Sequence, residues 1–305
     1  MTPHTRLDQE GVAVAAAPRA SPTGRLECRV PDSPSPALQI AALRAWFEAC
    51  AAVRVACSGG IDSLLLAHLA HEVLGASARI VHAVSAAVPP AATERVLTEG
   101  RAQGWSVELI DAGEFDDERY VANPVDRCFY CKTRLYAALE RIGHESLPGQ
   151  FTVSGTNVDD LGEYRPGLTA AKAFGVRHPY VETGVGKADI RAMARVLRRP
   201  YAELPASPCL SSRLYTGTRV TPERVRFVDR AEQLVRTRTG SAVVRCRLDG
   251  DTLRLELPGV ERARADSALL DALRAAAAEQ LPEIRAVVID ERGYAPGRAF
   301  VGAPR

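Results

Sequence analysis

The sequence lacks any apolar segment long enough to cross a membrane. It has 305 residues, 46% hydrophobic and 25% charged, and no apolar run approaches the roughly 18 residues that a membrane helix needs. The first residues also lack the basic start and apolar stretch of a signal peptide. We therefore expect a globular, cytoplasmic protein with no membrane partner. A chain of this length favours two domains.

An excess of charge of one sign is also missing. Lys and Arg total 39, against 37 for Asp and Glu, whereas dedicated nucleic-acid binders usually carry a strong basic excess. The balance argues against a nucleic-acid partner. It leaves room for a local basic patch that binds a smaller anion.

The cysteines lack the pattern of a disulfide framework, because there are seven of them and no export signal precedes them. Cys128 and Cys131 form a C-x-x-C pair, which is suited to a metal or cluster, to a redox disulfide or to a protein core. A second C-x-x-C is absent, and Cys209 is the best candidate for a third thiolate. We expect structural roles for the other cysteines, which are Cys28, Cys50, Cys57 and Cys246.

Two common nucleotide-binding motifs, G-x-x-x-x-G-K-[ST] and G-x-G-x-x-G, are absent. The stretch "VRVACSGGIDSLLLAHLA" instead predicts a strand, the loop Ser58-Gly59-Gly60 and a helix that begins near Asp62 and Ser63. The glycines let backbone N–H groups approach an anion, and the helix N-terminus adds donors. The serine hydroxyls add further donors, and Asp62 could hold Mg²⁺. The alternative is a tight turn without a ligand. We call residues 58–60 the phosphate loop.

Strands and helices alternate from residue 37 to 215, which predicts a doubly wound parallel sheet in an α/β fold. Residues 1–36 are rich in Ala, Pro and Ser and predict a disordered extension. The expected strands are residues 53–57, 78–85, 106–112 and 151–156, and the expected helices are residues 37–51, 63–75, 92–104 and 128–143.

The alternation ends near Thr216, and residues 216–305 predict a smaller α+β domain with the order α-β-β-α-β. Its first helix should be capped by Thr221, and Asp249-Gly250 predicts a hairpin turn. Along this hairpin apolar residues alternate with Arg245 and Arg247. The apolar set should face the core, and the arginines should form either a solvated face or an anion-binding pair.

The phosphate-loop pattern S-G-G-x-D-S resembles that of the PP-loop ATP pyrophosphatases. The resemblance implies an adenine nucleotide alpha hydrolase-like fold that binds ATP, splits it between the α- and β-phosphates and adenylylates a substrate. Two later stretches agree with it. "VSGTNVDD", with Gly155, is a second strand-to-glycine turn, and "VGKADIR" places Lys187 before a helix as a second phosphate-binding segment.

Two further stretches, "YRPGL" at residues 164–168 and "PCLSSR" at residues 208–213, resemble the LarE family. These are ATP-dependent sulfur transferases, or sulfur insertases, of nickel-pincer nucleotide cofactor biosynthesis. The resemblance runs from about residue 38 to the end. It implies adenylylation of a pyridinium dicarboxylate mononucleotide, then replacement of carboxylate oxygen by sulfur. A sulfur donor and a homo-oligomer are further implied partners.

The resemblance also implies roles for the cysteines. In one branch of the family a single cysteine gives up its sulfur and becomes dehydroalanine. In the other branch, C-x-x-C and the cysteine of P-C-L-[SA]-S-R hold a [4Fe-4S] cluster that carries the sulfur. This sequence resembles the second branch, with Cys128, Cys131 and Cys209 as ligands. Cys209 as a sacrificial donor is the alternative.

The remaining expected site residues act on the nucleotides. Asp62 and Lys187 join Cys209 as expected catalytic residues. The family's acidic residue near a helix end matches Glu232, whereas the family's Y-R-S-G-S is replaced by "YAPGR" here. The candidates for gripping the substrate phosphate and carboxylates are Ser212, Arg213, Arg245 and Arg247.

Three other functions stay open at this point. A tRNA-thiolating enzyme would share the loop and the cysteines but should carry a basic face. An amide-forming synthetase of the NAD or GMP type would not need the three cysteines. A regulator would bind ATP without turnover.

Overall fold

The structure is a computed structural model that describes residues 34–143, 149–162, 165–295 and 297–302. Residues 1–33 of the expected extension, with Cys28, lie outside this part of the chain, as do Tyr164 of "YRPGL" and Pro296 of "YAPGR". Within it, no helix combines the length and apolar character that a membrane span requires.

A four-stranded parallel sheet with the order β3-β2-β1-β4 confirms the expected α/β architecture. Val55 in the centre of the sheet pairs with Ile80 on one side and Val153 on the other. A parallel bridge between Val153 and Arg177 extends the pairing beyond β4. The strands are β1 (Val53–Ala56), β2 (Ala78–Ala83), β3 (Ser106–Ile110) and β4 (Phe151–Ser154).

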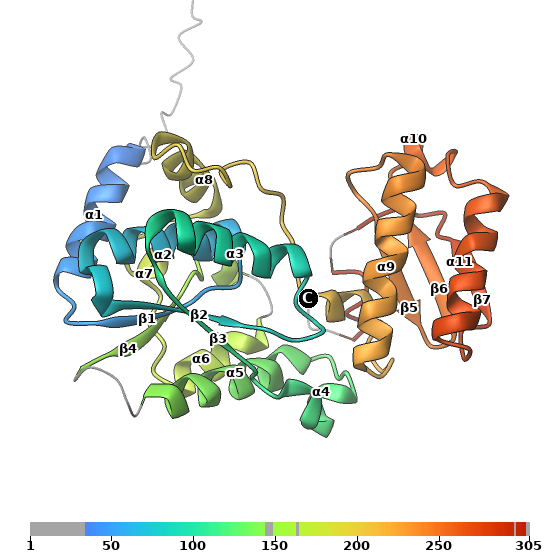
Figure 1. Cartoon of the computed structure of the whole chain (residues 1–305), viewed down its shortest axis with the longest axis horizontal. Coiled ribbons are helices and arrows are strands. Elements are labelled where there is room, and N and C mark those ends of the chain that lie inside the picture. Colours follow the sequence, from blue (N-terminus) through green and yellow to red (C-terminus); the bar gives the residue numbers. More distant parts are fainter. Residues whose placement is uncertain (1–33, 144–148, 163–164, 296, 303–305) are drawn as a thin grey trace, which may run out of the picture. The chain divides into compact units, whose positions relative to one another are not determined.

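Helices cover both faces of this sheet (Figure 1), as expected for a doubly wound fold. One face carries α1 (Pro36–Glu48), α2 (Ile61–Leu74), α3 (Pro90–Gln103) and α8 (Lys187–Val196), and the other carries α5 (Arg127–Gly143) and α6 (Pro166–Ala173). Two short helices, α4 (Glu118–Val121) and α7 (Pro179–Glu182), were not expected from the sequence. The central strands are apolar because both of their faces are buried: Val53, Val55 and Val153 have no exposed surface.

The C-terminal elements follow the expected order, with one added short helix. They are α9 (Pro222–Thr239), β5 (Arg245–Asp249), β6 (Thr252–Glu256), α10 (Gly259–Arg262), α11 (Ser267–Gln280) and β7 (Ala286–Ile289). β5 and β6 are antiparallel and β6 and β7 parallel. Thr221 caps α9, and Gly250 turns the hairpin at a φ of 58°. The expected domain boundary at residues 215/216 stays a prediction.

The order of the four-stranded sheet determines where a ligand can bind. The chain leaves β1 for β2 on one side, and β4 later joins β1 on the other side. In open parallel sheets, ligands bind beyond the carboxyl ends of the strands at such a switch point. The phosphate loop follows β1 and Gly155 follows β4, so both predicted nucleotide segments lie at this crevice.

Candidate functional site

The phosphate loop makes a turn that its two glycines permit. Gly59 has a φ of +77°, and a Cβ there would lie 2.5 Å from the carbonyl oxygen of Ala92 on α3. Gly60 is the N-cap of α2 and its side-chain position is open, with Ser58 Oγ nearest at 3.6 Å. Close packing thus explains the first glycine, whereas the fold leaves room for a small side chain at the second.

Hydrogen bonds hold the phosphate loop in place. Ser63 Oγ accepts from Ser58 N at 3.0 Å and donates to Gly60 O at 3.0 Å. From α3, Arg95 Nε donates to Gly59 O at 3.1 Å. The Ser63 hydroxyl, expected to bind phosphate, therefore organises the loop in the ligand-free chain.

The second predicted segment packs directly against the first. A Cβ on Gly155 would lie 3.0 Å from the carbonyl carbon of Asp62. Lys187 Nζ forms a 2.9 Å ion pair with Asp160. Burial raises the pKa of Asp62 to about 6, and the Asp160 carboxylate adds to this rise while Lys187 opposes it. Asp62 and Lys187 are therefore within electrostatic reach of each other.

One cavity of about 840 Å³ connects the phosphate loop with the predicted sulfur chemistry, and we call it the shared cavity. Its wall includes Ser58, Gly60, Asp62 and Ser63 after β1; Ser154, Gly155, Thr156 and Asp160 after β4; Arg127, Cys128, Lys132 and Tyr136 on α5; and Pro208, Cys209, Ser212, Gly297, Phe300 and Gly302 later in the chain. The volume is in the range of sites for drug-sized ligands.

The three candidate cysteines come from two segments. Cys128 and Cys131 lie on the first turn of α5, and exposed Cys209 precedes the short 3-10 helix η4 (Leu210–Arg213). Burial raises the pKa of Cys131 to about 12, and the charges of Cys209 and Cys128 add to this rise. Burial would lower the pKa of Lys132, but Tyr136 and the three cysteines raise it. The three thiols thus lie within electrostatic reach of one another.

A metal centre is not preformed in the described part of the chain. No three or more His, Cys, Asp and Glu side chains there are arranged to hold a metal ion. The cysteines match an iron–sulfur centre by residue type, whereas their arrangement does not yet converge on one point. Mg²⁺ requires fewer protein ligands, because one or two carboxylates together with substrate phosphates and water can hold it.

The predicted substrate ligands divide into two groups. Ser212 lines the shared cavity. Arg213 is buried, with a 3.0 Å ion pair to Glu232, and its Nη1 donates to the carbonyl oxygens of Pro208 and Cys209. Both members of that pair therefore already have a charged partner, and their contact with substrate stays a prediction.

The two hairpin arginines differ, because Arg247 has a carboxylate partner, as Arg213 does, whereas Arg245 contacts an aromatic ring. Arg247 is buried, forms a 3.0 Å ion pair with Glu256 and donates to Ser212 O at 2.8 Å. Arg245 is half-buried, with its guanidinium carbon 5.1 Å from the Tyr294 ring centroid. The apolar residues of β5 do face the core, as expected, but the opposite side is covered at Arg247 rather than solvated. Binding of a substrate anion by these arginines stays a prediction.

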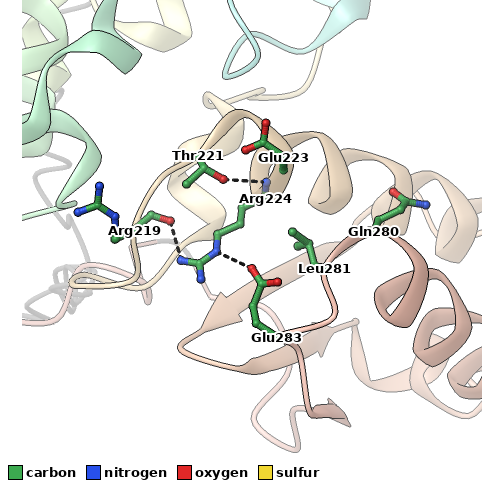
Figure 2. Close-up of a pocket in the computed structure, with 7 residues that line it drawn as sticks. All are labelled: Arg219, Thr221, Glu223, Arg224, Gln280, Leu281 and Glu283. Atoms are coloured by element: carbon green, nitrogen blue, oxygen red, sulfur yellow. Dashed lines mark hydrogen bonds and ion pairs between the residues drawn. The ribbon is translucent and has the colours of Figure 1, made fainter.

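A second cavity, of about 380 Å³, contains none of the predicted site residues (Figure 2). Arg224 crosses it, with Nη1 donating to Arg219 O at 3.0 Å and Nε at 3.4 Å from Glu283. Thr221 on its wall caps α9. These contacts are structural, so the shared cavity is the candidate site.

Known proteins were compared with the whole chain, and no protein-family model matches it. A pyridinium-3,5-bisthiocarboxylic acid mononucleotide synthase of Lactiplantibacillus plantarum is 31% identical over 247 residues, which cover 81% of this chain and 88% of that protein. The chain belongs to the family of this synthase. An uncharacterised Synechocystis protein is 38% identical over 71% of this chain and 80% of its own length, and one from Methanocaldococcus jannaschii is 26% identical over 62% and 71%.

This member of the synthase family has cavity residues that we did not select from the sequence. Four of them that carry a charge or an aromatic ring are Arg127, Lys132, Asp160 and Phe300. Three of them had a local signal, because Arg127 and Lys132 flank the C-x-x-C pair and Asp160 ends "VSGTNVDD". Phe300 had none, since a side chain far along the sequence reaches the cavity only through the tertiary fold.

Proposed function

We propose that the protein is an ATP-dependent sulfur transferase that converts a carboxylate of a pyridinium dicarboxylate mononucleotide to a thiocarboxylate, in nickel-pincer nucleotide cofactor biosynthesis. The observation that carries this proposal is the shared cavity, whose wall contains the phosphate loop together with Cys128 and Cys209. The relative named as a bisthiocarboxylic acid mononucleotide synthase supports the substrate class.

The first half-reaction activates the carboxylate. A carboxylate oxygen attacks the α-phosphorus of ATP, and the bond to the bridging oxygen of pyrophosphate breaks. The N–H groups at the start of α2, beyond Gly60, are positioned to stabilise the charge that accumulates on the phosphates. Lys187 lies at the N-terminus of α8 and would neutralise part of the leaving pyrophosphate. Asp62 would hold Mg²⁺, which supplies Lewis-acid stabilisation of the phosphates when bound.

The second half-reaction delivers sulfur. A sulfur nucleophile attacks the carbonyl carbon of the acyl-adenylate, and AMP leaves with the electron pair of its bond to carbon. Cys209 is exposed and lines the shared cavity, so sulfur can arrive at this residue. Cys128, Cys131 and Cys209 would hold the [4Fe-4S] cluster, which would carry the transferable sulfide.

The sacrificial version is the second candidate, and the exposure of Cys209 on the wall of the shared cavity favours it. There the Cys209 thiolate displaces AMP from the acyl carbon. A base then removes the Cα proton, the C–H electron pair forms the Cα=Cβ bond of dehydroalanine, and the Cβ–S bond breaks with its electron pair staying on the sulfur of the thiocarboxylate.

The test combines turnover with analysis of the protein itself. Protein purified without oxygen is incubated with ATP, Mg²⁺, a sulfide source and pyridinium-3,5-dicarboxylate mononucleotide. We expect pyrophosphate, AMP and a product in which sulfur replaces oxygen. Iron and sulfide in the purified protein with an unchanged Cys209 mass support the cluster. Dehydroalanine at 209 supports the sacrificial version, and absence of pyrophosphate release rejects the proposed function.

A further inference from the structure

Arg127, the first residue of α5, is a buried cation without a carboxylate partner among the described residues. Its side chain is 2% exposed. Nη1 donates to the side-chain oxygen of Asn123 and, at 2.9 Å, to Ser211 O. Nη2 is buried and has no hydrogen-bond partner in the described part of the chain. One end of the guanidinium is therefore fixed, and Nη2 at the other end can donate to a ligand. The guanidinium also interacts with the Cys128 thiol, where it opposes the rise in pKa that burial causes.

Two other buried arginines have a carboxylate partner, which Arg127 lacks in the described part of the chain. Arg213 and Arg247 are each less than a tenth exposed, and each forms an ion pair with a buried glutamate. Arg54 is also buried, forms no ion pair among the described residues and has a buried Nε without a hydrogen-bond partner, but it lies outside the wall of the shared cavity and its Nη1 donates to Leu139 O at 2.7 Å. What distinguishes Arg127 from Arg54 is therefore its place in the cavity wall. A buried charge without a counter-charge costs several kcal/mol. The surroundings of Arg127 thus favour the binding of an anion.

The guanidinium is held rigidly. Asn123 has a left-handed backbone, with a φ of 56°. Its side-chain nitrogen donates to Tyr215 O at 2.8 Å and Thr218 O at 2.7 Å, while its side-chain oxygen accepts from Arg127. Ser211, the other partner of Arg127, also bonds the Tyr120 hydroxyl at 2.7 Å. Both partners of Nη1 are therefore fixed, so the direction of Nη2 is fixed as well.

The position of Arg127 identifies the kind of anion. Arg127, its neighbour Cys128 and Cys209 all belong to the wall of the shared cavity, together with the phosphate loop. The proposed reaction must hold one anionic group near both the sulfur donor and the α-phosphorus, and that group is the substrate carboxylate. A single free nitrogen suits one charge-assisted bond to a carboxylate oxygen. We propose that Arg127 binds a substrate carboxylate through Nη2, an assignment that rests on the proposed function.

Phe300 lies beside the guanidinium of Arg127 on the wall of the shared cavity. Its ring centroid lies 5.7 Å from the guanidinium carbon of Arg127, and its side chain also lines the shared cavity. The neighbouring Ala299 O accepts from Thr216 N at 2.9 Å, which anchors the segment through its backbone. The Phe300 side chain can therefore change rotamer beside the guanidinium without breaking this anchor.

A matched pair of ligands tests the assignment. Nicotinic acid mononucleotide and nicotinamide mononucleotide share the ring, ribose and phosphate, and only the first carries a carboxylate. We expect wild-type protein to bind the acid about 10- to 100-fold more tightly in calorimetry, because a hydrogen bond to a charged group contributes about 1.5–3 kcal/mol. Equal affinity for the two ligands would overturn the assignment.

Variants locate the effect. Arg127→Gln should remove the preference while leaving ATP affinity unchanged, whereas Arg54→Gln, the matched buried control, should keep it. Phe300→Ala should keep the preference with equal or tighter binding. If Arg127→Gln does not fold, Arg127→Lys decides, because an ammonium group cannot copy the fork of the guanidinium. The preference should then fall at least about fivefold, and an unchanged preference contradicts the assignment.

The outcomes separate this assignment from the proposed function. Equal weakening of both mononucleotides in Arg127→Gln means that Arg127 binds phosphate, which overturns the carboxylate assignment. Wild-type sulfur transfer with an undiminished preference in Arg127→Gln also overturns it and leaves the function standing. A third outcome combines two results. The preference for the acid disappears in Arg127→Gln, and the wild-type protein releases no pyrophosphate with the dicarboxylate substrate. This outcome supports the carboxylate site and rejects the proposed function.

Discussion

Buried charges are paired beside the three-stranded sheet but not fully balanced at the crevice of the four-stranded sheet. Beside the three-stranded sheet, Arg213 and Arg247 meet Glu232 and Glu256, and the four side chains are at most 5% exposed. At the crevice of the four-stranded sheet, burial and a neighbouring carboxylate raise the pKa of Asp62 to about 6. Balanced charge is suited to holding a structure, whereas unbalanced charge indicates a place where a ligand completes the balance.

The largest expected effect comes from removing any one of the three candidate cysteines. Cys128→Ala, Cys131→Ala and Cys209→Ala should each lower sulfur transfer by at least about 100-fold if the three thiolates act as one unit. ATP affinity should be unchanged, because the phosphate loop lies on another segment. Activity assays and iron analysis of each variant provide the measurement. Loss confined to Cys209→Ala would point to the sacrificial version instead.

The next largest effect concerns stability beside the three-stranded sheet. Glu232 pairs with Arg213 at 3.0 Å and Arg236 at 2.8 Å. Glu232→Gln leaves the buried Arg213 charge unpaired, so the free energy of unfolding in urea should fall by about 3–5 kcal/mol. Arg213→Met combined with Glu232→Leu should recover much of that loss. A change within 0.5 kcal/mol for the single variant would refute the structural role of the pair.

Asp62→Asn should have the opposite profile, with a loss of activity and no loss of fold. Removing the carboxylate removes the expected Mg²⁺ ligand, so pyrophosphate release should fall by about 100-fold. The control is Asp266→Asn, which alters an N-cap of α11 away from the shared cavity. Unchanged pyrophosphate release in Asp62→Asn would show that Asp62 only begins a helix.

The smallest expected effect is the contribution of Asp62 to the pH dependence of stability. Because the folded-state pKa of Asp62 is about 6, above its ordinary value of 3.8, ionisation of Asp62 destabilises the folded chain. This penalty is absent below pH 4, grows as the pH rises to about 6, and is constant above it. The free energy of unfolding of Asp62→Asn at pH 8, measured in urea, should therefore exceed that of wild type by on the order of 1–2 kcal/mol. An equal gain at pH 4 would contradict this origin.

Local signals in the sequence predicted the parts of the fold that depend on neighbours along the chain. The cap at Thr221 and the turn at Gly250 are each required by geometry within a few residues. The alternation around Arg247 predicted the apolar face of β5 correctly. On the other face, Arg247 contacts Glu256 on the partner strand of the same hairpin and the backbone of Ser212. The Ser212 contact depends on a chain segment outside the hairpin, which the alternation along β5 does not report.

The candidate site divides in the same way. Glycines and the C-x-x-C spacing pointed to the phosphate loop and to Cys128, both of which the shared cavity contains. Arg127 was missed, although it precedes Cys128, because its unusual feature is a missing partner rather than a pattern. Whether a buried charge has a partner depends on Asn123, Ser211 and everything else that surrounds it, and a period along the chain carries no such information.

The two adjacent glycines of the phosphate loop have different consequences for protein engineering. A methyl group on Gly59 would collide with the backbone of Ala92, whereas one on Gly60 would meet nothing closer than Ser58 Oγ at 3.6 Å. A variant library should therefore keep position 59 constant and diversify position 60. Small side chains at position 60 would extend into the shared cavity beside the start of α2. If the nucleotide binds there as we propose, position 60 offers a route to a changed nucleotide preference without redesigning the scaffold.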